Sequence, residues 1–490
     1  FTTTVINAYI KPLMSNYLKK LEYELIEKGF NCPLLLMTSG GTLTNIPSAC
    51  NNPVRLVESG PAGGAILATS IARDLGLNKV ISFDMGGTTA KITIIENKKA
   101  IKAREFEVDR KARFKKGSGF PLRIPVIEMV EIGAGGGSIA RVNKLEQIIT
   151  GPDSAGSLPG PACYCNGGTL PTITDADLII GKINPENFAG GKIKLSKDLA
   201  ADAITKNISQ IVNLDMDTAA LAISEIVDET MSNAARVHTV EQGHETSSRT
   251  LIAFGGAAPL HVARVAEKLK VSSIIIPTNA SVGSAVGFLK APVGYEVVKS
   301  LRTLLKAFPV KKVNDLLKIM REEAEKVIEN KSEKNNFLEE RFAYMRYAGQ
   351  GHEIKVPIEN NLLSIRHVDS IKSSFEKKYE KLYSRILPNA DIEILTWSLS
   401  LSIQSENENE YKELNSYTNR EESTLIDLID YHSEKKIKVP YFERNDLNPG
   451  DLIMGQCIIS EDQTTIIVSK NFNTKVLGNN FLKMEYNKNE

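Results

Sequence analysis

The spacing of apolar residues changes repeatedly along the first 300 positions of the chain. Between Val5 and Leu25 apolar side chains recur every three or four residues, which predicts an amphipathic helix. The runs Lys79–Asp84 and Ala90–Ile95 are typical of strands, and the bend between them, Met85–Thr89, is rich in glycine. This pattern predicts a β-hairpin with glycine at its tip.

A second pattern of strand, glycine and helix follows later in the chain. Thr250–Phe254 has the composition of a buried strand, and Gly255 and Gly256 end it. Pro259–Leu269 then has the spacing of a helix, and the apolar run Val271–Pro277 predicts the next strand. Strands that alternate with helices favour an α/β domain.

The intervening and following stretches suggest how the chain divides. Gly151–Thr172 is dense in Gly, Pro, Ser and Cys and predicts a long loop, whereas Asp175–Gly243 has helical spacing with one apolar face. Further along, the composition shifts toward Lys, Glu and Asn. We therefore expect one domain over residues 1–298 and a smaller α+β domain over residues 299–490. The charged segment Glu406–Thr424 is predicted to be a surface linker.

Composition and charge narrow the possible classes of function. The 490 residues are 42% apolar and 24% charged, as in soluble proteins of two or three domains. The 60 basic and 59 acidic residues nearly cancel, which favours neither nucleic acid nor an anionic membrane as a partner. The five cysteines, and the lack of a signal peptide or an apolar run of about 18 residues, predict a cytoplasmic location. The chain begins with Phe1, and we expect it to be part of a longer protein.

The segment Asp84–Thr89 is a candidate phosphate-binding loop. Adjacent glycines let backbone N–H groups approach phosphate oxygens, and threonine hydroxyls can donate to the same oxygens. A carboxylate at the end of a strand can hold Mg²⁺ through water or can orient a nucleophile. Taken alone, the motif would also fit a plain glycine turn. The candidate residues are Asp84, Gly86, Gly87, Thr88 and Thr89, with Lys91 nearby.

A second candidate site lies where the later strand meets its helix. Gly255 and Gly256 would let a nucleotide base or ribose lie against the start of the helix, whose N-terminus offers free N–H groups. His261 falls in the first turn of this helix and is expected to point toward the same loop, as a tentative substrate contact. The alternative is a packed histidine with one satisfied nitrogen.

A third glycine-rich segment, Gly133–Ser138, follows Glu131. A carboxylate beside three glycines suits an anion or substrate site, but glycines equally allow strands to pack closely. We take Glu131, with Asp84, as a candidate catalytic residue. Gly135 and Gly136 are tentative substrate contacts.

The other cysteines, aspartates and histidines considered as metal ligands do not have the spacing of a metal site. Cys163 and Cys165 have a Cys-X-Cys spacing without a second pair, so structural zinc is not expected. Asp175 and Asp177 begin a predicted helix and are interpreted as its cap and dipole partners. Histidines spaced four apart, as in helical metal sites, do not occur among His238, His244, His352, His367 and His432.

Six blocks in a fixed order resemble the hydantoinase A/oxoprolinase family. The order of the blocks is more specific than any single block. Similarity continues through Met345–Glu353 and Pro449–Gly455 to Thr464 and Thr465, so it covers nearly the whole chain. The six blocks are Ser59–Ala65, Phe83–Thr88, Glu131–Ser138, Gly160–Tyr164, Thr174–Ala176 and Ala253–His261.

The resemblance implies an actin-like, sugar-kinase-like ATPase fold. It also implies that ATP, with Mg²⁺, phosphorylates the carbonyl oxygen of a cyclic amide of the hydantoin or 5-oxoproline type, or of a ketone in related carboxylases. Such proteins work with a hydantoinase B-type partner. The residues from Asp84 to Thr89 match the family's phosphate loop, and Gly255 and Gly256 match its glycines on the adenosine side.

The chain departs from the family pattern in two respects. Members of the family carry an additional N-terminal domain with its own Asp-X-Gly-Gly-Thr loop, and this sequence has one such loop. We therefore expect the missing half on another chain or on a longer protein. Lys91 stands where many relatives have an acidic residue, which leaves the substrate open. The alternatives to a cyclic amidohydrolase subunit are a ketone carboxylase subunit and a non-catalytic scaffold.

Overall fold

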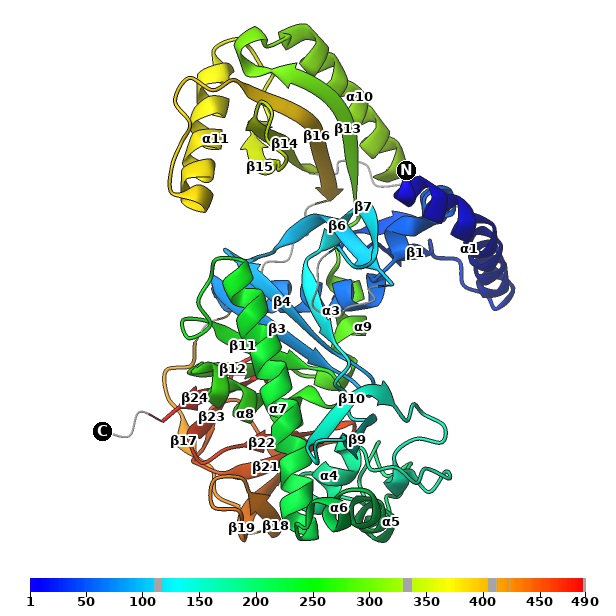
Figure 1. The fold of residues 1–490 in the computed structure, drawn as a ribbon, viewed down its shortest axis with the longest axis vertical. Coiled ribbons are helices and arrows are strands. Elements are labelled where there is room, and N and C mark those ends of the chain that lie inside the picture. Colours follow the sequence, from blue (N-terminus) through cyan, green and yellow to red (C-terminus); the bar gives the residue numbers. More distant parts are fainter. Residues whose placement is uncertain (110–116, 329–336, 404–410, 412, 423, 488–490) are drawn as a thin grey trace. The chain divides into compact units, whose positions relative to one another are not determined.

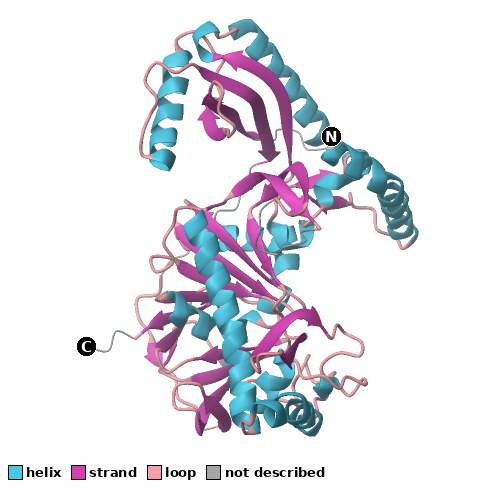
Figure 2. Cartoon of the chain, viewed as in Figure 1, coloured by secondary structure: helices cyan, strands magenta, loops and turns pink. Residues whose placement is uncertain are grey.

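A computed structural model of the protein describes residues 1–109, 117–328, 337–403, 411, 413–422 and 424–487. The chain forms two compact units, each assembled from three separate stretches. Figure 1 labels their elements, and Figure 2 distinguishes helices from strands. Unit 1 comprises Phe1–Ser59, Ala103–Val126 and Ala291–Asn407, and unit 2 comprises Gly60–Lys102, Ile127–Lys290 and Glu408–Glu490.

Unit 2 is built on a 10-stranded mixed sheet. At its centre β3 (Lys79–Met85), β11 (Thr250–Phe254) and β12 (Ser273–Ile276) run parallel, with β11 in the middle. β4 (Ala90–Glu96) and β8 (Met129–Ile132) continue the sheet antiparallel beyond β3. The carboxyl ends of the three parallel strands therefore meet at one edge of the sheet. The other strands are β5 (Lys99–Ala100), β17 (Thr418–Asn419), β20 (Asp451–Ile453), β23 (Phe472–Val476) and β24 (Leu482–Tyr486).

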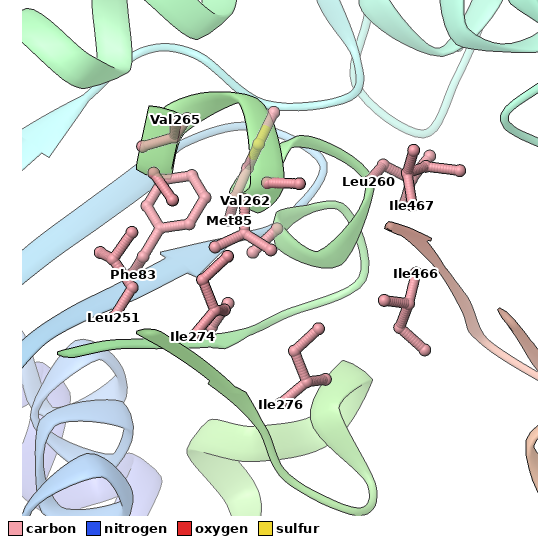
Figure 3. Packing of buried hydrophobic residues seen from close by; sticks show 14 of the residues in the cluster. Phe83, Met85, Leu251, Leu260, Val262, Val265, Ile274, Ile276, Ile466 and Ile467 are labelled. Carbon is pink, nitrogen blue, oxygen red and sulfur yellow. The ribbon is translucent and has the colours of Figure 1, made fainter. Parts of the chain in front are cut away.

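Helices bury both faces of the central strands. Figure 3 shows Phe83, Met85 and Leu251 among the apolar side chains beside α8 (Ala258–Leu269), and all three are almost fully buried. The alternate side chains lie on the other face, where Phe254 contacts Gly64 of α3 (Ser59–Asp74) and Gly283 of α9 (Gly283–Lys290). The alternation along each strand therefore separates two helical layers.

Further elements complete unit 2 around this sheet. A 4-stranded sheet joins strands from the last third of the chain and packs against α8 through β22. These elements are α4 (Ile173–Ile180), α5 (Lys197–Ile204), α6 (Gln210–Val212), α7 (Met216–Glu241), β9 (Ser138–Val142), β10 (Ile148–Ser154), β18 (Leu425–Asp430), β19 (Lys435–Glu443), β21 (Cys457–Glu461) and β22 (Thr464–Val468).

Unit 1 contains a 4-stranded antiparallel sheet in the order β13–β16–β14–β15. Trp397 is fully buried in the core between this sheet and its two helices, α10 and α11. The elements of the unit are α1 (Thr2–Glu27), α2 (Ile46–Asn51), α10 (Val310–Ile328), α11 (His367–Tyr383), β1 (Leu35–Met37), β2 (Leu43–Asn45), β6 (Lys102–Val108), β7 (Phe120–Ile127), β13 (Gly294–Leu304), β14 (Phe337–Tyr347), β15 (Ile354–Ile358) and β16 (Ile392–Ile403).

The α/β class, the hairpin of β3 and β4 and the unit of β11 and α8 are confirmed. The compact units are a different division from the expected domains, residues 1–298 and 299–490, which stay a prediction. After Glu408 the chain returns to unit 2, because β24 pairs with β12 and extends its sheet. The predicted linker also differs, since Thr418–Asn419 forms β17, while residues 406–410, 412 and 423 lie outside the described residues.

Glycines allow α3 and α9 to cross at short distance. Substitution of one of these glycines tests this packing. A Cβ on Gly287 would lie 1.8 Å from the carbonyl oxygen of Gly63. Gly287→Ala should lower the free energy of unfolding by about 1–3 kcal/mol through overpacking. Urea titration followed by circular dichroism measures the change. Gly60→Ala in α3 is the control, because its Cβ would meet nothing within 4 Å. Equal stability of the two variants would contradict this packing.

Candidate functional site

A cavity of about 340 Å³ lies at the carboxyl edge of β3, β11 and β12, within the size range of small-molecule sites. The loops after these strands contribute the bare backbone of Gly86, Gly87 and Gly256, with Ala257 and Ser281 beside them. Ligands of α/β proteins bind outside the carboxyl ends of parallel strands. The position of the cavity thus agrees with a ligand site.

Two glycine-rich loops are interlocked beside the cavity. Gly136 N–H donates to the carbonyl of Gly86 at 3.0 Å, and Gly137 N–H donates to that of Gly87 at 2.7 Å. A Cβ on Gly135 would lie 2.5 Å from the nitrogen of Thr88. Close packing therefore requires the glycines after Glu131, and Gly136 also lines the cavity.

The tip of the first loop presents free donors. Gly87 and Thr88 are exposed, and in the described part of the chain their N–H groups donate no hydrogen bond. Gly86 N–H is used within the loop, where it donates to the carbonyl of Thr89 at 3.1 Å. Two adjacent unpaired N–H groups at a strand end can bind an anion.

Asp84 does not line the cavity but lies directly behind the loop. Its carboxylate accepts a hydrogen bond from Ser284 Oγ at 3.1 Å and packs against Gly64 and Gly255. Burial raises the pKa of Asp84, against the opposing effects of Lys91 and of the Ser284 hydroxyl. A Cβ on Gly255 would lie 2.7 Å from this carboxylate and 2.3 Å from the carbonyl of Met85, at a φ of 96°. Glycine is thus required there to keep the site of Asp84 open.

Glu131 lies on the same face of the sheet as Asp84 and, like Asp84, does not line the cavity. In the register of the sheet, Asp84 lies opposite Lys91 and Lys91 lies opposite Glu131. The three side chains therefore form a row across β3, β4 and β8. Lys91 Nζ lies 2.6 Å from Thr89 Oγ1 and 3.7 Å from Glu131. Thr89 and Glu131 are therefore linked through Lys91.

His261 is fully buried in α8 and does not point toward the glycine loop, contrary to expectation. Its Nδ1 lies 2.8 Å from Asp228 of α7, and its Nε2 lies 3.1 Å from Asp177 of α4. Only the imidazolium form offers a proton to both carboxylates. His261 therefore fixes α8 between two other helices and makes no contact with the cavity.

Asp177 has a larger role than the cap expected from the sequence. It lines the cavity, and its Oδ1 accepts from Lys182 at 3.0 Å and from Ser224 at 3.2 Å. Burial opposes its ionisation, but Lys182 and His261 outweigh burial and lower the pKa of Asp177 to about 2. No local pattern predicts this group, because its members are far apart along the chain.

Asp175, in contrast, lies in the first turn of α4 as expected and forms a capping box with the N-cap residue Thr172. Its carboxylate also accepts the N–H groups of Ala162 at 3.2 Å and Cys163 at 2.7 Å. Cys163 is buried and Cys165 exposed, and no group of three or more metal-binding side chains occurs among the described residues. Asp175 therefore holds the long loop against α4 by hydrogen bonds.

Two further walls of the cavity were not identified from the sequence. One is the segment after α4, which contributes Asn184, Asn187 and Phe188, and the Phe188 ring lies 5.6 Å from that of Tyr164. The other is the turn between β21 and β22, from Glu461 to Thr464, whose last residue hydrogen bonds to the Gly256 carbonyl at 2.9 Å. These residues lack a local motif, and only the fold brings them together.

No helix in the described ranges is both long and apolar enough to cross a membrane.

Stability should depend on pH through His261. Burial lowers the pKa of His261, but Asp177 and Asp228 outweigh burial and raise it to about 9 from 6.5. The folded state thus binds this proton more tightly, so the contribution is complete below pH 6.5 and is lost as the pH rises through about 9. We expect a loss on the order of 3 kcal/mol, measured by urea unfolding across this range.

The pH-dependent loss should be absent from His261→Gln. His352→Gln, which removes an exposed histidine, should keep the wild-type behaviour. A wild-type pH dependence in His261→Gln would contradict the assignment of this proton to His261.

Comparison with known proteins identifies both parts of the chain. The family model described as hydantoinase/oxoprolinase matches residues 1–297, and the hydantoinase/oxoprolinase C-terminal domain matches residues 307–487. An uncharacterized protein of Methanocaldococcus jannaschii is 36% identical over 475 residues, which cover 96% of this chain and 68% of the relative.

Two relatives with named activities are also similar. The caprolactamase subunit alpha of Pseudomonas jessenii is 29% identical, with 95% of this chain and 67% of the relative covered. The crystal structure of the ATP-dependent caprolactamase from the same organism superposes with a TM-score of 0.83, covers 99% of this chain and 70% of that chain, and is 27% identical. The acetophenone carboxylase gamma subunit of Aromatoleum aromaticum is 31% identical over 58% of this chain and 38% of the relative.

The match to the Methanocaldococcus relative, over 96% of this chain, and the two family models agree with the six blocks recognised in the sequence. The chain belongs to the hydantoinase/oxoprolinase family.

Proposed function

We propose that this chain is the ATP-dependent subunit of a hydrolase that activates a cyclic amide of the hydantoin or 5-oxoproline type. The observation that carries the proposal is the pair of exposed N–H groups of Gly87 and Thr88, which donate no hydrogen bond among the described residues, beside a cavity lined by Gly86, Gly87 and Gly256. Such donors suit phosphate oxygens, and the bare backbone beside them suits a ribose.

The fold of unit 2 supports an actin-like ATPase. A hairpin, β3–β4, carries the glycine loop at its tip, and β11 and β12 lie parallel to β3 beside it. Gly255 and Gly256 then join β11 to α8, so that the phosphate loop and the adenosine-side glycines are neighbours. In this proposal Gly86, Gly87, Thr88 and Thr89 bind phosphates, and Gly255 and Gly256 lie along the adenosine.

The surroundings of the Asp84 carboxylate suit an interaction with hydrated Mg²⁺. Its carboxylate lies at the end of β3 with a single hydrogen-bond donor in the described residues, Ser284, so that lone pairs remain for water molecules. When bound, Mg²⁺ would neutralise charge on the phosphates. Because Asp84 does not line the cavity, a water molecule between the carboxylate and the ion is expected.

The proposed reaction is a phosphoryl transfer. The carbonyl oxygen of the cyclic amide forms a bond to the γ-phosphorus as the bond to the β-phosphate oxygen breaks, and ADP leaves. The phosphorylated amide is then open to attack by water, which releases phosphate as the ring opens. Positioning and charge neutralisation carry most of such catalysis. Glu131 and Lys91, linked to Thr89, are the candidates for orienting the substrate end.

A hydantoinase B-type subunit is the proposed partner for ring opening. Two of the relatives are named as subunits, alpha for the caprolactamase and gamma for the acetophenone carboxylase. A second candidate function, the ATP-dependent subunit of a ketone carboxylase, is favoured by the 31% identity with the acetophenone carboxylase gamma subunit.

A coupled assay for ADP release tests the proposal. We expect ATP turnover stimulated by hydantoin, 5-oxoproline or a related lactam when a hydantoinase B-type subunit is present. Stimulation by acetone or acetophenone that depends on bicarbonate would instead favour the carboxylase. If ATP neither binds nor turns over with or without that partner, both enzyme functions are wrong.

Asp84→Asn should reduce ATP turnover about 100-fold or more, because it removes a charge from behind the phosphate loop while keeping the size of the side chain. Circular dichroism and thermal unfolding should match those of the wild type. Asp198→Asn, an exposed carboxylate in the first turn of α5, is the matched control and should leave turnover unchanged. Wild-type turnover in Asp84→Asn would refute the role of Asp84.

A further inference from the structure

The cavity of unit 2 has an unusual charge for a site that binds a polyanion. Its lining includes the carboxylates of Asp177, Glu461 and Asp462, and within the described residues it includes no lysine or arginine. Phosphate sites normally contain such cations. The lining therefore offers phosphates backbone N–H groups without a balancing positive side chain.

Three cations that lie close to residues of the cavity lining are engaged with carboxylates. Lys182 pairs with Asp177 at 3.0 Å, and Arg444 pairs with Glu461 at 2.7 Å. Lys91, behind the glycine loop, lies 3.7 Å from Glu131. Each of these positive charges is balanced locally, and each contributes little net field at the cavity.

Asp462 lies at the exposed tip of the turn between β21 and β22 and lies in no ion pair in the described residues. Its neighbour Glu461 is balanced by Arg444, and burial raises the pKa of Glu461. The turn therefore adds a net negative charge to one wall of the cavity, and Asp462 carries it.

The wall beside this turn suits a flat, uncharged group, and Asn187 of that wall donates to Ser460 of β21 at 3.4 Å. Tyr164 and Phe188 place two aromatic rings there, with centroids 5.6 Å apart, and Asn184 and Asn187 add amide groups. Aromatic faces and amides recognise a base by stacking and hydrogen bonds. The cavity thus combines contacts for a nucleoside with an electrostatic barrier to free phosphates.

We infer that the turn Glu461–Gln463 makes the cavity selective for the charge state of its nucleotide, so that the chain binds the nucleoside part directly and admits the phosphates as their Mg²⁺ complex. This inference rests on the proposed binding of ATP and deepens it. Mg²⁺ cancels part of the phosphate charge, which reduces repulsion by Asp462. Asp462 is thereby a specificity-determining residue.

Isothermal titration calorimetry with adenosine, with ATP in EDTA and with ATP plus Mg²⁺ tests this inference on the full chain. For the wild type we expect ATP in EDTA to bind at least roughly tenfold more weakly than its Mg²⁺ complex, because repulsion falls with ligand charge. Asp462→Asn should strengthen binding of ATP in EDTA about threefold or more and leave adenosine binding unchanged. High salt should reduce this gain.

Glu461→Gln provides a second variant. It frees the Arg444 guanidinium and should strengthen binding of uncomplexed ATP at least as much as Asp462→Asn does. Asp198→Asn on α5, outside the cavity lining, should change none of the three affinities. If both turn variants bind uncomplexed ATP as the wild type does, the inference is overturned while ATP binding stands. If neither adenosine nor the Mg²⁺ complex binds the wild type, the proposed function itself fails.

Discussion

The site depends on the pairing of two glycine-rich loops. The carbonyls of Gly86 and Gly87 accept hydrogen bonds from the N–H groups of Gly136 and Gly137, which fixes the loop after β3, while the N–H groups of Gly87 and Thr88 have no acceptor in the described part of the chain. A side chain at Gly135 would push the loops apart by meeting Thr88. Buried backbone polar groups need hydrogen-bond partners, and here the N–H groups of the second loop pair with the carbonyls of the first. The availability of these two N–H groups on the first loop is thus a property of the pair.

Charge pairing keeps the surroundings of these loops rigid and close to neutral. Asp177, Lys182, His261 and Asp228 join three helices in a buried group whose two negative and two positive charges balance. A buried ion pair that loses one member is strongly destabilising, so these residues act as one unit. The first turn of α8 is held at the cavity by this unit, although His261 itself lies outside the cavity lining.

Local sequence signals were sufficient for the central elements and insufficient for the walls of the site. The hairpin of β3 and β4, the glycines before α8 and the place of Asp175 at the start of a helix follow from patterns within a few residues, and each was predicted. The contacts of His261 with Asp177 and Asp228, and the approach of Thr464 to Gly256, join residues far apart in the chain. Such contacts depend on the packing of the helices and on strand order, which propensity and periodicity do not encode. The compact units join distant stretches of the chain for the same reason, since a strand near the C-terminus pairs with β12.

The return of the chain to unit 2 has a consequence for how this protein can be dissected. A truncation at the boundary between the two family models would delete β24 and leave β12 as an uncovered edge of the central sheet. It would also remove the wall contributed by the β21–β22 turn. Exposed edge strands pair readily with other chains, so a fragment cut at that boundary is expected to aggregate rather than fold as an independent nucleotide-binding module.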